Sequence, residues 1–294
     1  YCEVSAFRYL YLLKEGNREA TRAFNTAMTE FASADPSRLI SSYQIPIHDI
    51  DGAIAEVEWV ARQGGKSLQL PVFPAELGLP DYWDERYDPL WAVIQETNLP
   101  ICLHIGLNTQ LESLARRDPT PQKGIFVGAV ALSTAEPLGM FIWGGVFERF
   151  PKLKVMLVEG GTMFMFPSWL RLMDFHYTEG QISAKLGNFR GHLSRKPSEY
   201  FHRNVGIGAS CVLRPDLELR DEIGLGKIMW GSDFPHPEGS WPNTAQYFKD
   251  NFGNFPEEDG RRILGENAIE FYGLDRQKLQ SVANDIGPDV SMFH

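Results

Sequence analysis

Short apolar segments alternate with helical segments along most of the chain, and this alternation limits the possible folds more than any other feature. We expect buried strands over 38–47, 66–73, 99–106, 154–161, 204–210 and 227–233. Strands that alternate with helices in this way form βαβ units and a parallel sheet. Because crossovers between parallel strands are right-handed, the choice is between a barrel and a doubly wound sheet.

The helical segments carry apolar residues at a spacing of three and four. A first helix is predicted over 8–33, ended by Asp35 and Pro36. Others are predicted over 49–63, 89–97, about 125–149, up to about 177, about 215–223, 243–251 and 256–271. The polar stretch 108–124 is interpreted as a long loop, in which Arg116 and Arg117 form either a solvated pair or part of a lid over an anionic substrate.

A barrel is the better choice, because no GxGxxG motif follows a strand and no P-loop is present. A closed barrel needs eight βα units, and six are visible. We therefore expect an α/β fold, a TIM-like (β/α)8 barrel whose first one or two βα units are missing from this sequence, a deficit of about 60 to 100 residues. Residues 1–294 would form a single, N-terminally incomplete barrel domain, and Tyr1 is not an initiator methionine.

The composition limits the classes of molecule that the protein is expected to bind. The net charge of −10 argues against nucleic acid and anionic membranes and leaves a small-molecule substrate. No apolar run reaches about 18 residues, so no membrane span is expected. The three cysteines are far apart and form no CxxC pattern, which favours a reducing, cytoplasmic location.

Polar residues stand at the ends of three predicted strands, where parallel barrels keep their chemistry. His104 ends the third, Asp233 ends the sixth, and Glu159 lies at the end of the fourth. Strand alternation places Glu159 on one face with Val155 and Leu157. If these faces point inward, the three side chains converge on one mouth of the barrel. An imidazole and carboxylates suit Zn²⁺ or a similar ion that activates water or polarises a substrate oxygen.

Several segments, in order and spacing, resemble the amidohydrolase-related family, the branch of the amidohydrolase superfamily that contains aminocarboxymuconate-semialdehyde decarboxylase and γ-resorcylate decarboxylase. They are Tyr87-Asp-Pro-Leu-Trp91, Leu99-Pro-Ile-Cys-Leu-His-Ile-Gly106, Phe150-Pro-Lys-Leu-Lys154, Val158-Glu-Gly160, Pro197-Ser-Glu-Tyr-Phe201, Trp230-Gly-Ser-Asp-Phe-Pro-His236 and Glu266-Asn-Ala-Ile-Glu-Phe-Tyr-Gly273. The resemblance covers about residues 38 to 275.

The resemblance implies a TIM-like barrel that holds one divalent metal ion, with Zn²⁺ as the first expectation and Mn²⁺ or Fe as alternatives. His104 matches the family's fifth-strand histidine ligand, and Asp233 matches its eighth-strand aspartate. The family's acidic-x-His pair on the first strand has no counterpart here. Glu159 stands where the named decarboxylases carry a histidine that acts as proton donor or base. The strand ending at Phe73 has no lysine, which favours a mononuclear site.

We therefore expect a metal-dependent hydrolase or carboxy-lyase that acts on a small carboxylated or aromatic-like compound, with His104 and Asp233 as metal ligands. Asp233, Glu159 and His236 are the predicted catalytic residues. The alternatives are a core histidine for His104, capping roles for the two acids and a solvated loop histidine for His236. At the level of function they are a metal-free lyase or hydratase on the same barrel, and a non-catalytic subunit that partners an active paralogue. A homo-oligomer is expected from the family.

Overall fold

The computed structural model describes residues 5–104, 124–125, 128, 131–159, 163–180 and 182–294. The predicted loop 108–124, with Arg116 and Arg117, lies outside the described residues apart from its last position. Within the described part of the chain, no helix combines the length and the apolar character needed to cross a membrane.

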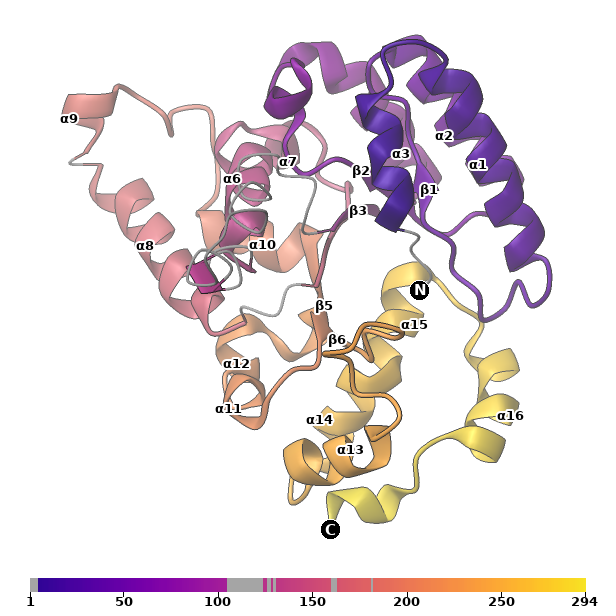
Figure 1. The fold of residues 1–294 in the computed structure, drawn as a ribbon. Coiled ribbons are helices and arrows are strands. Elements are labelled where there is room, and N and C mark those ends of the chain that lie inside the picture. The colour runs from indigo at the N-terminus through magenta and orange to yellow at the C-terminus, as the bar shows by residue number, and fades with distance from the viewer. Residues whose placement is uncertain (1–4, 105–123, 126–127, 129–130, 160–162, 181) are drawn as a thin grey trace.

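Six parallel strands form one sheet, and their order in the sheet is their order in the sequence. They are β1 (Tyr43–Gln44), β2 (Leu68–Leu70), β3 (Ile101–His104), β4 (Val155–Val158), β5 (Val205–Ser210) and β6 (Ile228–Gly231). This sequential parallel order, with helices between the strands, is the arrangement of a TIM-like barrel. Among the described strands, β1 and β6 lie at the two edges of the sheet (Figure 1).

Helices connect the strands and cover the outer side of the sheet (Figure 1). The α-helices are α1 (Asn17–Ala32), α2 (Ile50–Arg62), α3 (Asp88–Thr97), α6 (Ala135–Trp143), α7 (Val146–Arg149), α8 (Met165–Glu179), α9 (Ser183–Leu186), α10 (Pro197–Asn204), α11 (Arg214–Leu217), α12 (Arg220–Ile223), α13 (Thr244–Phe252), α14 (Glu257–Arg261), α15 (Asn267–Tyr272) and α16 (Arg276–Ile286). A π-helical segment, Arg262–Glu266, joins α14 to α15. Short 3-10 segments lie at Ser5–Leu12, Pro74–Leu77, Glu85–Tyr87, Ala131–Thr134, Leu225–Lys227 and Val290–Phe293.

The predicted helix over 8–33 is wrong in one respect, because the structure divides it. A 3-10 segment ends at Leu12, and α1 begins only at Asn17, after Gly16 with φ of 68°. Glycine adopts this left-handed conformation without a steric penalty, so the chain changes direction there. The predicted strand over 38–47 is also too long. Its paired part is Tyr43–Gln44, and Pro46 has no N–H to continue the ladder.

The two faces of the sheet carry different cores. Ile101, Leu103, Val155 and Leu157 belong to the large apolar core with the helices. The inner face carries a second, smaller cluster, whose buried members are Ile40, Cys102, Met156, Met229 and Tyr272. Tyr272 comes from α15, so this helix covers part of the inner face of the sheet. The last residues of the strands lie at the open end of this inner cluster.

Candidate metal and acid–base centre

The residues that follow three neighbouring strands have an unusual backbone. Glu159 follows β4 with φ of 55°, Cys211 follows β5 with φ of 48°, and Asp233 lies two residues beyond β6 with φ of 57°. Side-chain-bearing residues rarely adopt this left-handed region, and such conformations persist where the surrounding structure enforces them. The carboxyl edge of the sheet therefore carries local strain at three adjacent strand ends.

The structure shows that the predicted inward face of the fourth strand, β4, is wrong. Strand alternation placed Glu159 on the inner face with Val155 and Leu157. Instead, Met156 and Val158 face the inner cluster, and Val155 and Leu157 pack under the helices. The strand ends at Val158, and the turn at Glu159 then redirects its side chain toward the mouth. The predicted convergence is found, but the reason given by strand periodicity is wrong.

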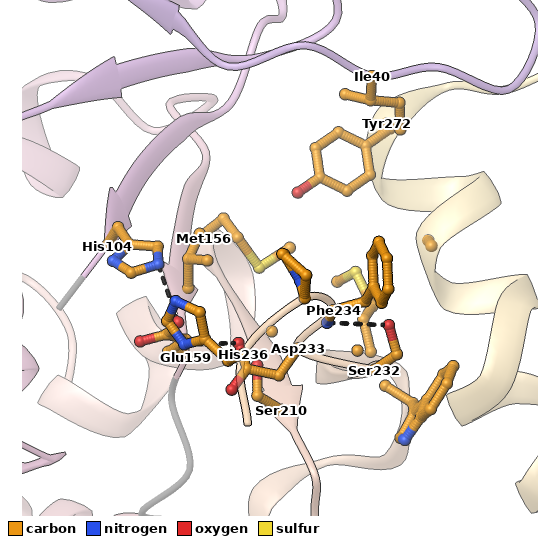
Figure 2. Close-up of a pocket in the computed structure, with 17 residues that line it drawn as sticks. Ile40, His104, Met156, Glu159, Ser210, Ser232, Asp233, Phe234, His236 and Tyr272 are labelled. Atoms are coloured by element: carbon orange, nitrogen blue, oxygen red, sulfur yellow. Dashed lines mark hydrogen bonds and ion pairs between the residues drawn. The ribbon is translucent and has the colours of Figure 1, made fainter. Parts of the chain in front are cut away.

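Glu159, Asp233 and His236 form a compact group in which one ligand atom from each lies within 4.8 Å of the others. His104 lies beside this group rather than within it, with its Nε2 atom 3.1 Å from Oε1 of Glu159. The Nδ1 atom of His236 lies 3.6 Å from Oδ1 of Asp233. Figure 2 shows these side chains converging from β3 and from the ends of β4 and β6. Two carboxylates and two imidazoles thus share one small volume.

Burial and charge make the two acids interact. The side chain of Asp233 is 15% exposed and that of Glu159 is 17% exposed. Burial, and after it the negative charge of Glu159, raise the pKa of Asp233 to about 6, although His236 acts in the opposite direction. Two crowded, partly desolvated carboxylates disfavour holding both charges at once. A cation or a shared proton therefore stabilises this arrangement.

The loop after β6 fixes His236 over Asp233. The His236 amide donates to the Asp233 carbonyl at 2.8 Å, and the Ser240 amide donates to the Ser232 carbonyl at 2.9 Å. A Cβ atom at Gly239 would lie within 3.0 Å of three backbone carbonyl oxygens, so only glycine fits there. The Cys211 thiol contacts the Ser232 and Glu238 carbonyls, at 3.7 and 3.6 Å. The loop is therefore tied both to itself and to the end of β5.

A pocket of about 590 Å³ opens beside the group. This size falls within the range of small-molecule sites. Its walls include His104, Glu159, Asp233 and His236 at one side, and otherwise apolar or small residues, namely Ile40, Met156, Val158, Gly208, Ser210, Met229, Trp230, Gly231, Ser232, Phe234, Pro235, Ala268 and Tyr272 (Figure 2). Among the described residues, neither lysine nor arginine lines it.

All four sequence-predicted site residues line this one pocket, but their grouping differs from the prediction. The expected metal pair was His104 with Asp233, whereas the tight group joins Asp233 to Glu159 and His236. Tyr272 and Met156 were missed. A tyrosine on a helix after the last strand gives no periodic signal that it faces the inside of the sheet, so only the packing of α15 reveals it.

The comparisons with known proteins agree with this fold. The model of the amidohydrolase family matches residues 15–274, so the chain belongs to this family. It is similar to γ-resorcylate decarboxylase from Polaromonas sp. (strain JS666 / ATCC BAA-500), with 23% identity over 88% of this chain and 77% of that protein.

Solved structures show the same fold. The 5-carboxyvanillate decarboxylase of Sphingomonas paucimobilis matches with a TM-score of 0.75 and 23% identity, over 90% of this chain and 76% of that one. A dihydroxybenzoic acid decarboxylase from Polaromonas sp. JS666, solved with bound manganese and the inhibitor 2-nitroresorcinol, matches with a TM-score of 0.68 and 22% identity, over 88% and 76%.

Proposed function

We propose that this protein is a metal-dependent carboxy-lyase, which removes carbon dioxide from a small aromatic-like carboxylate without oxidation. The observation that carries the proposal is the group of Glu159, Asp233 and His236 at one side of a pocket with apolar walls. The family supports it, and the similar proteins named above are decarboxylases. Hydrolysis, the other reaction expected of the family's ligand set, is the competing outcome of the test.

The donor set fits a divalent ion. Carboxylate oxygens and imidazole nitrogens suit Zn²⁺, Mn²⁺ and Fe²⁺. We propose that Asp233 and His104 bind it, and the closeness of Glu159 and His236 to Asp233 supports a ligand role for these two side chains as well. Manganese in the Polaromonas structure supports a divalent ion and makes Mn²⁺ as good a candidate as Zn²⁺. Such an ion polarises a substrate oxygen.

The remaining chemistry is a proton transfer. Decarboxylation breaks one carbon–carbon bond, releases carbon dioxide and leaves an electron pair on the substrate carbon, which then takes a proton. We infer that Asp233 delivers this proton, because its carboxylate lines the pocket and lies 3.6 Å from the Nδ1 atom of His236, whose side chain is 48% exposed and links the site to solvent. Glu159 orients His104 through their 3.1 Å contact.

The test is carbon dioxide release from γ-resorcylate and 5-carboxyvanillate, with Mn²⁺ or Zn²⁺ supplied and again after chelation. Release that needs the metal and disappears in Asp233→Asn supports the proposal. Asp285→Asn, an exposed substitution on α16, is the control and should retain activity. Release that survives chelation would favour the metal-free lyase. Hydrolysis of amides or esters without carbon dioxide release would replace the lyase by a hydrolase.

We further propose a cytoplasmic homo-oligomer. Phe164, Leu172 and Phe175, at or on α8, are between 52% and 60% exposed, and exposed apolar side chains of this size support a contact with a second copy. Among the described residues, Cys102 and Cys211 are not joined in a disulfide, which is compatible with a reducing compartment. Light scattering of the purified protein tests the oligomer, and a monomer at all concentrations would contradict it.

A further inference from the structure

The loop after β6, residues 232–240, closes on a thiol whose side chain does not line the pocket. The two ends of this loop meet, because the Ser240 amide donates to the Ser232 carbonyl at 2.9 Å. The Cys211 sulfur lies beside this closure, 3.7 Å from the Ser232 carbonyl oxygen and 3.6 Å from that of Glu238. The thiol therefore contacts both ends of the loop from outside the pocket.

The backbone at position 211 favours glycine over cysteine. Its φ of 48° lies in the left-handed region, which glycine adopts without a steric penalty. A residue with a side chain keeps such a conformation where its surroundings enforce it. Here the Cys211 amide donates to the Gly231 carbonyl at 3.2 Å, so β6 holds the backbone. What cysteine adds to this position is the set of contacts that its sulfur atom makes.

The thiol is a donor in this setting. Burial raises the pKa of Cys211, and the negative charge of Asp233 also raises it, while the Ser240 amide acts in the opposite direction. The sulfur therefore keeps its proton and faces two carbonyl oxygens that can accept it. Each S–H contact is weak. Because the two carbonyls belong to separate parts of one loop, the sulfur nevertheless restricts where the whole loop can lie.

We propose that Cys211 is a positioning residue, whose thiol holds the 232–240 loop where Asp233 and His236 face the pocket. Asp233 follows Ser232 directly, and the His236 amide donates to the Asp233 carbonyl at 2.8 Å, so a shift of the loop moves both side chains. The consequence for activity rests on the proposed function, in which Asp233 binds the ion and delivers the proton. Misplacing a reacting group by about 1 Å can lower a rate about 10²-fold.

Substitutions of Cys211 separate positioning from a contribution to stability. Cys211→Gly removes the thiol and relieves the left-handed backbone, so urea denaturation should show an unchanged or higher free energy of unfolding. The loop should still loosen, and amide hydrogen exchange in a peptide that covers 232–240 should become about five-fold faster or more. Mn²⁺ affinity and kcat should each fall about 10- to 100-fold. Cys211→Ser keeps a donor and should restore most of the slow exchange and activity.

Asn98→Gly is the matched control, because Asn98 also has a left-handed backbone, with φ of 58°, but ends α3 before β3 begins. It should leave loop exchange, Mn²⁺ affinity and kcat unchanged. Unaltered exchange in Cys211→Gly would overturn the inference, and so would faster exchange with full Mn²⁺ affinity and kcat. Exchange is measured without metal or substrate. If the unmodified protein bound no Mn²⁺ and released no carbon dioxide, the proposed function would fail, while faster exchange in Cys211→Gly would still support the positioning of the loop.

Discussion

Asp233 and Glu159 define the site at the scale of single residues. Both adopt left-handed backbone conformations that cost free energy, and both hold carboxylates in partly buried positions. Neither feature stabilises a fold by itself. Such strain is retained where it orients a functional group, and here it brings the two acids together, with His104 beside Glu159 and His236 beside Asp233.

Glu159 gives the first prediction. Glu159→Gln keeps the size of the side chain and removes its charge. The protein should therefore fold, but residue 159 should interact more weakly with His104 and with the cation. We expect kcat to fall by about 10²- to 10⁴-fold, the range for loss of an acid–base or charge-stabilising group. Steady-state kinetics alongside circular dichroism would check this. Full activity in a folded Glu159→Gln protein would exclude Glu159 from the site.

The sequence predicted these residues unevenly. His104 and Asp233 could be identified because a polar residue after an apolar run has few explanations in a parallel barrel. Glu159 was chosen for a reason that fails, since one left-handed residue breaks the alternation on which the reasoning depended. His236 was ambiguous, because the spacing of three from Asp233 says nothing until the loop geometry brings the two side chains together.

At the scale of elements, β5 shapes the inside of the barrel through its glycines. A Cβ at Gly206 would meet the ends of Met229, Phe271 and Met156 at 2.9 to 3.2 Å. A Cβ at Gly208 would make only ordinary contacts, at 3.5 Å and beyond, although this residue lines the pocket. The same strand thus serves packing at one position and ligand space at the next inward position.

Valine at each position should separate these roles. Gly206→Val overpacks the inner cluster, and we expect it to lower the free energy of unfolding by about 1 to 3 kcal/mol. Gly208→Val should cost less stability but raise KM, because it narrows the pocket. Urea denaturation and steady-state kinetics measure the two effects. Equal destabilisation by both substitutions, or an unchanged KM in Gly208→Val, would contradict this division of roles.

Helix α10 gives a prediction on pH. Burial lowers the pKa of His202 below its ordinary value of 6.5, and the charge of Lys227 lowers it further. Below pH 6.5 the unfolded chain therefore binds the proton more readily than the folded protein does, so stability is lost as pH falls from about 7 toward the folded pKa. His202→Gln should flatten this dependence, as urea denaturation at pH 7.5 and 5.5 would show.

The exposed His294→Gln is the control for this series and should keep the slope of the original protein. Activity at pH 7.5 should be unchanged in His202→Gln, because α10 precedes β5 and lies at the opposite end of the strand from the site. An unaltered pH slope would mean that His202 does not contribute to the acid sensitivity of the fold.

Element boundaries were the weaker part of the sequence prediction. All six strands exist in the predicted order, because each apolar run needs a parallel neighbour and connections follow the sequence. The strands are shorter than predicted, since buried extended chain such as Ile45 and Ile47 lies outside the paired ladder. Gly16 divides the first helix, and helical spacing on both sides concealed the break.

At the scale of the whole molecule, the packing of α15 against the strands decides which side chains line the pocket. Strand periodicity predicts a sheet whose carboxyl edge carries the polar residues. It does not predict that a helix beyond β6 supplies an inner wall with Tyr272. That contact depends on many residues far apart in sequence. The contribution of α15 to the wall of the pocket is therefore visible only in three dimensions.

Native mass spectrometry of the protein during a titration with Mn²⁺ addresses the site most directly, since it counts bound ions without requiring a substrate. One ion per subunit is expected for the unmodified protein, and Asp233→Asn should bind it at least ten-fold more weakly. Asp285→Asn should behave as the unmodified protein does. No bound ion, or equal binding by Asp233→Asn, would contradict the assignment of Asp233 and its neighbours as a metal centre.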